Sequence, residues 1–396
     1  MALNKNDVYL IVRDAYLQSI GDIPESVLNL QGIIDTGSPA MIDNKDQFFN
    51  ALAVVIRDKY FFEDRAYSTY YKDDFFVDSA EFTGIMQAVS VEAPEAQENT
   101  AMRDFVSGTT KVGVYTVYKP IIHTHYFGKS ISWEIPVSYS GEQFDTAVHS
   151  EQGMEELVNY IFVAMSNAVT QHRKVMDDTN RNNFIAEKIQ YQSAHPDTVS
   201  KINLVEAYCK KIGNTAGMTV AQFLNDKDAL NFSASLLRRY KNYFTDLNTK
   251  FNSEGRIRFT PADEIVLHIN TEFAETVKYL AQANTFWKEL EELPYYRSVG
   301  YWQACDSFDF ADTTKIDVKI GSDGTEVNQS GVVAFMADKR AIMHTIVKDR
   351  TVTEYFKIDD IYHTVYQFVD KYVNNLTMNA LVFTLEDMPA PATGSK

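Results

Sequence analysis

The chain has few cysteines and too little positive charge to balance its acids. Only Cys209 and Cys305 occur among 396 residues, and their separation fits neither a metal-binding nor a redox motif. Such sparse cysteine is typical of a reducing cytosol, so we expect no disulfide. The 54 acidic residues outnumber the 37 basic ones, which gives a formal net charge of −17. Because DNA-binding proteins neutralise phosphates with lysine and arginine, this balance argues against tight, sequence-specific DNA binding.

Long hydrophobic runs are missing as well. No apolar run reaches the roughly 18–20 residues that a membrane-spanning helix needs. The first residues lack the apolar core of a signal peptide, so we expect neither a membrane partner nor secretion. The composition that remains is globular, with 45% apolar and 23% charged residues. The length suffices for two or three folded modules with a sizeable core.

Motifs that bind phosphate or metal ions are incomplete. Gly128–Ser130 looks like the end of a phosphate-binding loop, but that motif needs a glycine where His123 stands. His123 and His125 would share one face of a strand and could hold a metal ion, although no cluster with ligand spacing surrounds them. A solvated or interfacial histidine pair is the simpler interpretation.

Catalytic signatures are equally weak. Glu289, Glu291 and Glu292 form an acidic cluster near the end of a predicted helix, and carboxylates perform acid–base chemistry only where they converge in a cleft. His172 falls on an apolar helix stripe, which indicates a core histidine. Asp323–Gly324 lacks the alternating acids of a calcium loop, and no nucleophile elbow occurs. We therefore predict no catalytic, cofactor-binding or metal-binding residue, and no cofactor.

A stretch rich in β-branched residues runs from Phe82 to Tyr139. Phe82–Pro94 and Val112–Tyr118 are predicted strands, and Ile131–Tyr139 alternates apolar and polar residues as a half-buried strand does. A polar, charged segment separates the first two strands. Because a two-stranded ribbon is marginal alone in water, we predict an arm that pairs with neighbouring subunits. The alternative is an ordinary hairpin folded back on its own domain.

The next stretch predicts one long amphipathic helix. Ser150 is a suitable N-cap, and apolar residues from Met154 to Met176 recur at steps of three and four. This stripe covers about six turns, or roughly 35 Å. We expect the helix to bury the stripe and to act as a stiff beam along which a sheet lies.

The remaining segments predict a mixture of helices and short strands. Helices are expected at Asn6–Ile20, Gln47–Tyr60, Val199–Lys211, Ala229–Lys250 and from Thr271 onward, with a loop through Gly21–Pro39. Strands are expected at Arg256–Phe259, Ile265–Ile269, Ile316–Ile320, Val332–Met336 and Leu381–Leu385. Apolar residues between Ile361 and Val373 recur every four positions as in a helix, but their β-branched composition favours a strand, so both remain open.

Several stretches, taken in chain order, carry a resemblance to a known family. They are Asn44–Phe62, Glu81–Ala101, Gly128–Ser138 with the helix after it, Thr260–Val277, and Val332–Val347 with Tyr362–Thr384. In this order they resemble the major capsid proteins of tailed bacteriophages with the Hong Kong 97-type fold, and most of all those of small short-tailed, protein-primed phages. The likeness extends from about residue 6 to about residue 385 and rests on pattern and order.

The resemblance implies an α+β fold of the Hong Kong 97 type and a division into regions. An N-terminal arm would span residues 1–80, an extended E-loop hairpin 81–134, and a peripheral domain with a long spine helix 135–193. An axial domain would span 194–350, a returning segment of the core 351–386, and a flexible tail 387–396.

The resemblance also implies a structural, non-enzymatic function. Many copies would self-assemble, as pentamers and hexamers, into an icosahedral shell around a double-stranded DNA genome. Expected partners are a portal, head fibres or decoration proteins, and a separate scaffolding protein, since no long charged heptad segment precedes the arm. The excess of acidic over basic residues predicts only loose, non-specific proximity to packaged DNA. The protein would reside in the virion after assembly in the bacterial host cytoplasm.

Two other classes of function stay open at this point. One is a different virion subunit, such as a portal or minor capsid protein. The other is a hydrolase that uses the acidic cluster around Glu289.

Overall fold

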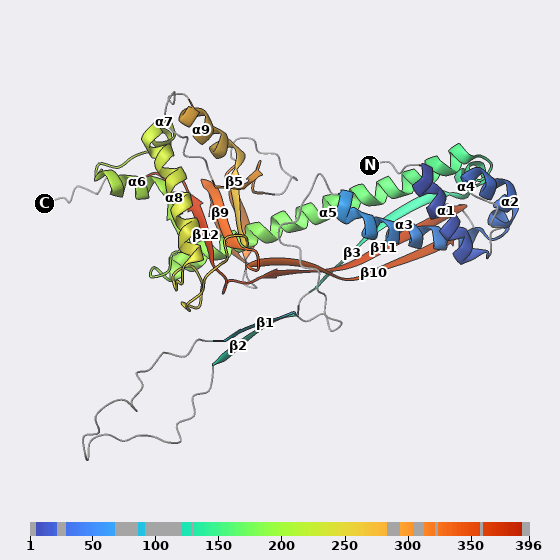
Figure 1. Cartoon of the computed structure of the whole chain (residues 1–396), viewed down its shortest axis with the longest axis horizontal. Helices are drawn as coiled ribbons and strands as arrows, with labels where there is room; N and C mark the ends of the chain where they lie inside the picture. Colours follow the sequence, from blue (N-terminus) through green and yellow to red (C-terminus); the bar gives the residue numbers. More distant parts are fainter. Residues whose placement is uncertain are drawn as a thin grey trace, which may run out of the picture. The chain divides into compact units, whose positions relative to one another are not determined.

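The computed structural model describes most of the chain. It describes residues 5–21, 29–67, 86–91, 121–128, 130–282, 294–303, 313–320, 324–356 and 359–389. The chain divides into two compact units, a smaller one at Ala80–Lys129 and a larger one that comprises Met1–Ser79 and Ser130–Lys396 (Figure 1). Within the described ranges, no helix combines the length and the apolar character that crossing a bilayer requires.

One region of the larger unit packs helices against a long antiparallel sheet. The sheet has the strand order β10–β11–β3 (Figure 1). Its strands are β3 (Ile131–Ser140), β10 (Ile342–Phe356) and β11 (Ile361–Asn374). The helices are α1 (Lys5–Ser19), α2 (Leu30–Asp43), α3 (Lys45–Tyr67), α4 (Gly141–Ala147) and α5 (Glu151–Ala194). Their apolar faces form one core with β3 and β11, which confirms the predicted half-buried strand at β3.

The long helix α5 starts where the sequence predicts and runs further. The Ser150 hydroxyl accepts a hydrogen bond from the Gly153 N–H at 3.0 Å, and the helix continues for 44 residues to Ala194. At 1.5 Å per residue it is about 66 Å long. The predicted stripe extends to Met176, but the helix buries it only from Met154 to Val169. The helix becomes more polar in the middle and then buries a second apolar group that includes Phe184. Two separate cores are therefore built on one helix.

A second region of the larger unit is built on a five-stranded mixed sheet. Its strand order is β4–β12–β9–β5–β6, with antiparallel pairs around β9 and parallel pairs at both edges. The strands are β4 (Lys201–Asn203), β5 (Ile265–Asn270), β6 (Arg297–Val299), β9 (Val332–Asp338) and β12 (Ala380–Thr384). All seven residues of β9 are buried, as expected for a central strand covered on both faces.

Alternate residues of this sheet serve two different cores. Leu381 and Phe383 of β12 pack with four helices, whereas Ala380 and Val382 pack with Phe184 and its neighbours on α5. The four helices are α6 (Leu204–Ile212), α7 (Val220–Asn225), α8 (Lys227–Thr245) and α9 (Thr271–Gln282). A hairpin of β7 (Ile316–Ile320) and β8 (Thr325–Gln329) adds residues to the α5 side, and it confirms the predicted strand at Ile316–Ile320.

Four sequence predictions need correction. The stretch Gly21–Pro39 is not all loop, because α2 begins at Leu30. Arg256–Phe259 forms no strand and makes one isolated bridge, between Arg258 and Asn248. The helix predicted to reach Lys250 ends at Thr245, and the one predicted from Val199 begins at Leu204 after the short strand β4. The open case at 361–373 is resolved as strand β11, with alternate residues buried.

Candidate assembly surfaces

The smaller unit contains a two-stranded antiparallel ribbon. Its strands are β1 (Met86–Val91) and β2 (Ile122–Phe127), which pair with Val91 opposite Ile122 and Val89 opposite Thr124. The strand predicted at Val112–Tyr118 lies outside the described residues.

Side chains of opposite residues in a ribbon project from the same face, so the register defines two faces. One face carries Val89, Val91, Ile122 and Tyr126, and we call it the ribbon face. These four side chains are between 56% and 68% exposed. A ribbon of only two strands is marginal in water, and a row of exposed apolar side chains is typical of an interaction surface.

The predicted histidine pair lies on the opposite face of the ribbon. His123 pairs with Ser90, and His125 pairs with Ala88, so the two rings share a face as the sequence predicts. In the part of the chain that the structure describes, no three or more His, Cys, Asp or Glu side chains gather as metal ligands would. Gly128 leads from β2 toward the strand β3, whereas a phosphate-binding loop leads into a helix N-terminus.

The other candidate residues from the sequence are not brought together. Glu289, Glu291, Glu292, Asp323 and Cys305 lie outside the described residues. Cys209 is buried in α6, and its burial raises the pKa of the thiol. His172 is half-buried on α5, and its ring stacks on Trp133 at a centroid distance of 4.1 Å. Burial lowers the pKa of His172, with the Asp370 carboxylate acting in the opposite direction. A packing role, as predicted, fits this geometry.

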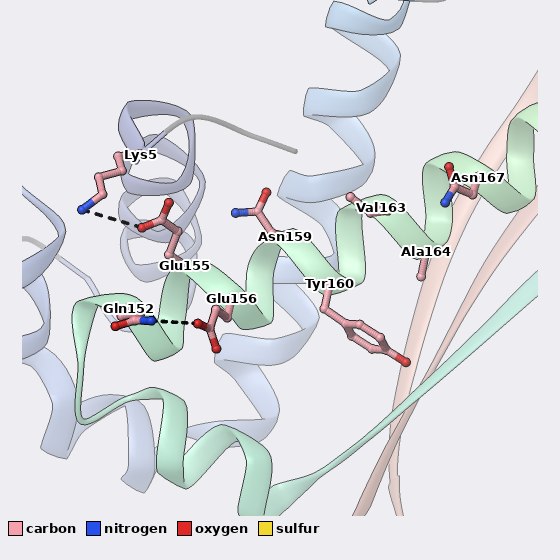
Figure 2. Close-up of a pocket in the computed structure, with 9 residues that line it drawn as sticks. All are labelled: Lys5, Gln152, Glu155, Glu156, Asn159, Tyr160, Val163, Ala164 and Asn167. Atoms are coloured by element: carbon pink, nitrogen blue, oxygen red, sulfur yellow. Dashed lines mark hydrogen bonds and ion pairs between the residues drawn. The ribbon is translucent and has the colours of Figure 1, made fainter. Parts of the chain in front are cut away.

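An open groove runs along the first turns of α5 (Figure 2). It has a volume of about 840 Å³ and is lined by Lys5, Gln152, Glu155, Glu156, Asn159, Tyr160, Val163, Ala164 and Asn167. The Lys5 ammonium lies 4.0 Å from the Glu155 carboxylate, and the Gln152 amide donates to Glu156 at 3.0 Å. Both carboxylates have partners, and the lining contains no histidine, cysteine or serine that could form a nucleophile–base pair.

A buried polar cluster, which the sequence did not reveal, fixes α5 to the long sheet. The Trp133 indole N–H of β3 donates to the Asp370 carboxylate of β11 at 2.7 Å. His344 of β10 lies between two carboxylates, with Nδ1 3.6 Å from Asp177 of α5 and Nε2 3.8 Å from Asp370. These four residues come from four elements, so the cluster fixes the position of the β10–β11–β3 sheet along α5.

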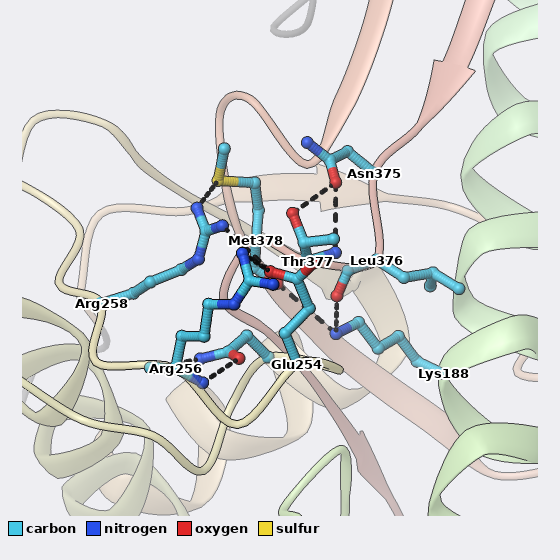
Figure 3. Close-up of polar contacts among 9 residues, drawn as sticks. Lys188, Glu254, Arg256, Arg258, Asn375, Leu376, Thr377 and Met378 are labelled. Carbon is cyan, nitrogen blue, oxygen red and sulfur yellow. Dashed lines mark hydrogen bonds and ion pairs between the residues drawn. The ribbon is translucent and has the colours of Figure 1, made fainter. Parts of the chain in front are cut away.

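A buried lysine joins α5 to two loops of the second region. The Lys188 ammonium donates to the backbone oxygens of Leu376 at 3.1 Å and Met378 at 3.5 Å (Figure 3). It also donates to the backbone oxygen of Phe251 at 3.3 Å. The side chain is fully buried. Burial without a carboxylate partner lowers the pKa of Lys188 to about 7.

The low pKa of Lys188 predicts that the folded chain gains stability in mildly alkaline solution. Between pH 7 and the ordinary lysine pKa of 10.5, the unfolded state binds a proton that the folded state lacks, so the free energy of unfolding rises with pH. The gain is at most about 1.4 kcal/mol per pH unit. We expect Lys188→Met to remove this rise, measured by chemical denaturation at several pH values. Lys210→Met, at an exposed lysine of α6, should keep the wild-type slope, and an unchanged slope in Lys188→Met would contradict the assignment.

The sequence matches one family model over most of its length. The model of the Phi29-like phage major capsid protein family matches residues 24–384. No curated protein matches the sequence.

Solved structures of phage particles are also similar, at low sequence identity. The capsid structure of Staphylococcus phage Andhra aligns with 80% of this chain and 84% of its own, with 10% identity and a TM-score of 0.45. A structure of the head fiber and inner core protein gp22 of native bacteriophage P68 aligns with 76% of this chain and 80% of its own, with 9% identity and a TM-score of 0.45. The capsid of cyanophage P-SCSP1u aligns with 78% of this chain and 85% of its own, with 9% identity and a TM-score of 0.38. On the family match over residues 24–384, the chain belongs to the Phi29-like phage major capsid protein family.

Proposed function

We propose that copies of this chain form an icosahedral shell of pentamers and hexamers around double-stranded DNA, and that the ribbon face makes a contact between neighbouring copies. Membership of a major capsid protein family supports a role in the shell. The observation that carries the contact is the row of exposed apolar side chains on the ribbon face, Val89, Val91, Ile122 and Tyr126. A shell multiplies one such contact over every subunit, so a modest area per contact stabilises the whole.

We propose a role for each region of the chain. Residues 1–80 act as an N-terminal arm, and residues 81–134 as an E-loop that lies over a neighbouring subunit. Residues 135–193, which include most of α5, form a peripheral domain, and residues 194–350 form an axial domain around the symmetry axes. Residues 351–386 complete the core, and 387–396 form a tail.

We also propose the partners and the surroundings of the shell. A separate scaffolding protein, a portal, and head fibres or decoration proteins assemble with it in the bacterial host cytoplasm, and the product is the virion. The P68 structure, for comparison, contains a head fiber. The net charge of −17 supports an acidic lumen along which packaged DNA slides without specific contacts. The chain acts as a structural protein and not as an enzyme.

The full chain, expressed with and without candidate scaffold proteins and imaged by electron microscopy, tests the proposal. Closed shells are the expected product. Rings would favour a portal instead, and a stable monomer with hydrolytic activity that Glu289→Gln abolishes would favour a hydrolase. A lumen that maps as strongly basic would count against the proposed DNA contact.

Deletion of Ala93–Thr110, the segment between the two ribbon strands, tests the E-loop role. We expect a soluble, folded chain that fails to close shells, because the deletion retains every residue that forms the described cores of the larger unit. Circular dichroism would establish folding, and sedimentation with electron microscopy would count the shells. A wild-type yield of shells from the deletion would refute the role of the arm.

A further inference from the structure

The segment from Arg256 to Phe259 turns its charged side chains inward and its apolar side chains outward. Ile257 is 66% exposed and Phe259 57% exposed, whereas Arg256 and Arg258 are largely buried. Asn248 and Arg258 exchange two backbone hydrogen bonds of 2.9 and 2.8 Å. Residues next to Asn248 and Arg258 in this antiparallel bridge project from the opposite face. Leu247, which is 72% exposed, therefore lies beside Phe259. We call Leu247, Ile257 and Phe259 the loop patch.

The inward side chains hold this loop in one conformation. The Asn252 side chain accepts from the Arg256 N–H at 3.1 Å and donates to the Arg256 carbonyl at 2.9 Å. The Glu254 carboxylate lies 3.0 Å from the Arg256 guanidinium and 3.4 Å from that of Arg258 (Figure 3). Arg258 also donates to the Met378 sulfur at 3.4 Å. Both arginines are therefore occupied within the chain.

The base of the loop is anchored to α5 and to the 376–380 segment. Lys188 donates to the Phe251 carbonyl, and the Tyr191 hydroxyl donates to the Ser253 carbonyl at 2.6 Å. Backbone bonds join Ser253 to Leu376 at 3.2 Å and Ala380 to Phe251 at 3.1 Å. A rigid loop that presents three exposed apolar side chains loses little conformational entropy when it binds, which is the property of a preorganised interface.

Charge indicates what covers the patch. Apart from the inward-facing Arg256 and Arg258 and their partner Glu254, residues 238–258 contain four basic residues and one acidic residue, in a chain whose net charge is −17. An apolar patch in a basic stretch of the chain complements an acidic protein surface, and the rest of this chain has an excess of acidic residues. Phosphate is a poorer match, because Arg256 and Arg258 point inward onto Glu254 and Met378 while the outward side chains are apolar.

We propose that the loop patch is an interface with a second copy of this chain. The inference rests on the proposed shell, in which each copy meets others at high local concentration. It assigns to assembly three residues that lie outside the ribbon, so each subunit would present at least two separate apolar contacts.

Serine substitution at all three patch positions tests the inference. We expect Leu247→Ser, Ile257→Ser and Phe259→Ser together to lower shell yield at least tenfold, while the thermal midpoint of the unassembled chain stays near that of the wild type. Ile257→Val, which keeps the apolar character, should assemble normally. If wild-type protein forms shells and the triple variant forms them equally well, the patch is not an interface and the proposed shell still stands. If wild-type protein forms no shells under any condition, the proposed function fails and this inference fails with it.

A cysteine at the patch gives a second readout that does not depend on yield. Ile257→Cys should react rapidly with a maleimide in the unassembled chain and at least tenfold more slowly in empty shells, after correction for the parent chain. Equal rates in both forms would overturn the inference. Protection confined to DNA-filled particles would overturn it too, because nucleic acid and not a second copy would then cover the patch.

Discussion

Shells will fail to form when serine replaces both Val89 and Val91 on the ribbon face. Both valines are more than half exposed in the single chain. Burial of this exposed apolar surface in a contact is therefore worth about 1 kcal/mol for each side chain. The double variant loses about 2 kcal/mol per contact, which weakens association roughly 30-fold. Because every subunit repeats the contact, the loss multiplies over the shell. Sedimentation and electron microscopy of the expressed chain would measure the drop in closed particles.

The opposite face of the same strand supplies a matched control. Ala88 directly precedes Val89 in β1 but projects from the other face, beside His125. Ala88→Ser adds a hydroxyl to β1 without touching the ribbon face, so we expect shells near the wild-type yield. If the double valine variant assembles as well as Ala88→Ser does, the ribbon face makes no essential contact.

The sequence predicts best where one hydrophobic period is clear. The stripe of α5 and the alternation of β3 are predicted correctly, because a buried face repeats at 3.6 residues in a helix and at 2 in a strand. The sequence of β11 is ambiguous, because apolar residues four positions apart lie on one face in a helix and in a strand alike. Its deepest side chains include Tyr362, Tyr366 and Phe368, which recur at even positions and indicate a strand.

Helix α2 escapes prediction because its glycine and proline are usual signals of a loop. The Asn29 side chain accepts from the Gly32 N–H at 2.8 Å and starts the helix, and Pro39 is tolerated inside it. Its buried residues Ile33, Ile34 and Met41 have helical spacing, so the signal is present in the sequence.

The candidate surfaces are predictable only in part. Composition and alternation predict an exposed β arm, but they do not predict which strand pairs with β1. The pairing depends on contacts between segments that a long loop separates in the sequence. The cluster of Trp133, Asp177, His344 and Asp370 joins residues up to 237 positions apart, between Trp133 and Asp370, and no local pattern encodes it. Two residues of the loop patch, Ile257 and Phe259, fall on a predicted strand, Arg256–Phe259, whose alternation is visible in the sequence but whose inverted orientation is not.

Gly331→Ala will destabilise the chain by about 3 kcal/mol or more. Gly331 precedes the central strand β9 with φ at +75°, where a residue with a side chain is strained by about 1–2 kcal/mol. A Cβ there would lie 2.1 Å from the Leu385 carbonyl oxygen, which is backbone and cannot rotate away. The Leu385 N–H donates to the Gly331 carbonyl at 2.7 Å, so relief of the clash would separate β9 from the end of β12. Overpacking of this kind adds about 1–3 kcal/mol.

The variant Gly213→Ala separates the cost of backbone strain from the cost of the clash with Leu385. Gly213 ends α6 with φ at +70°, and a Cβ added there would meet no atom within 4 Å, so alanine at this position is strained but not crowded. We expect it to cost about 1 kcal/mol, within the range for left-handed backbone alone. The free energy of unfolding of both variants, from chemical denaturation, measures the difference. Equal losses would mean that the approach of Leu385 to Gly331 adds no constraint, whereas a larger loss in Gly331→Ala shows that contact between β9 and β12 requires glycine at this position.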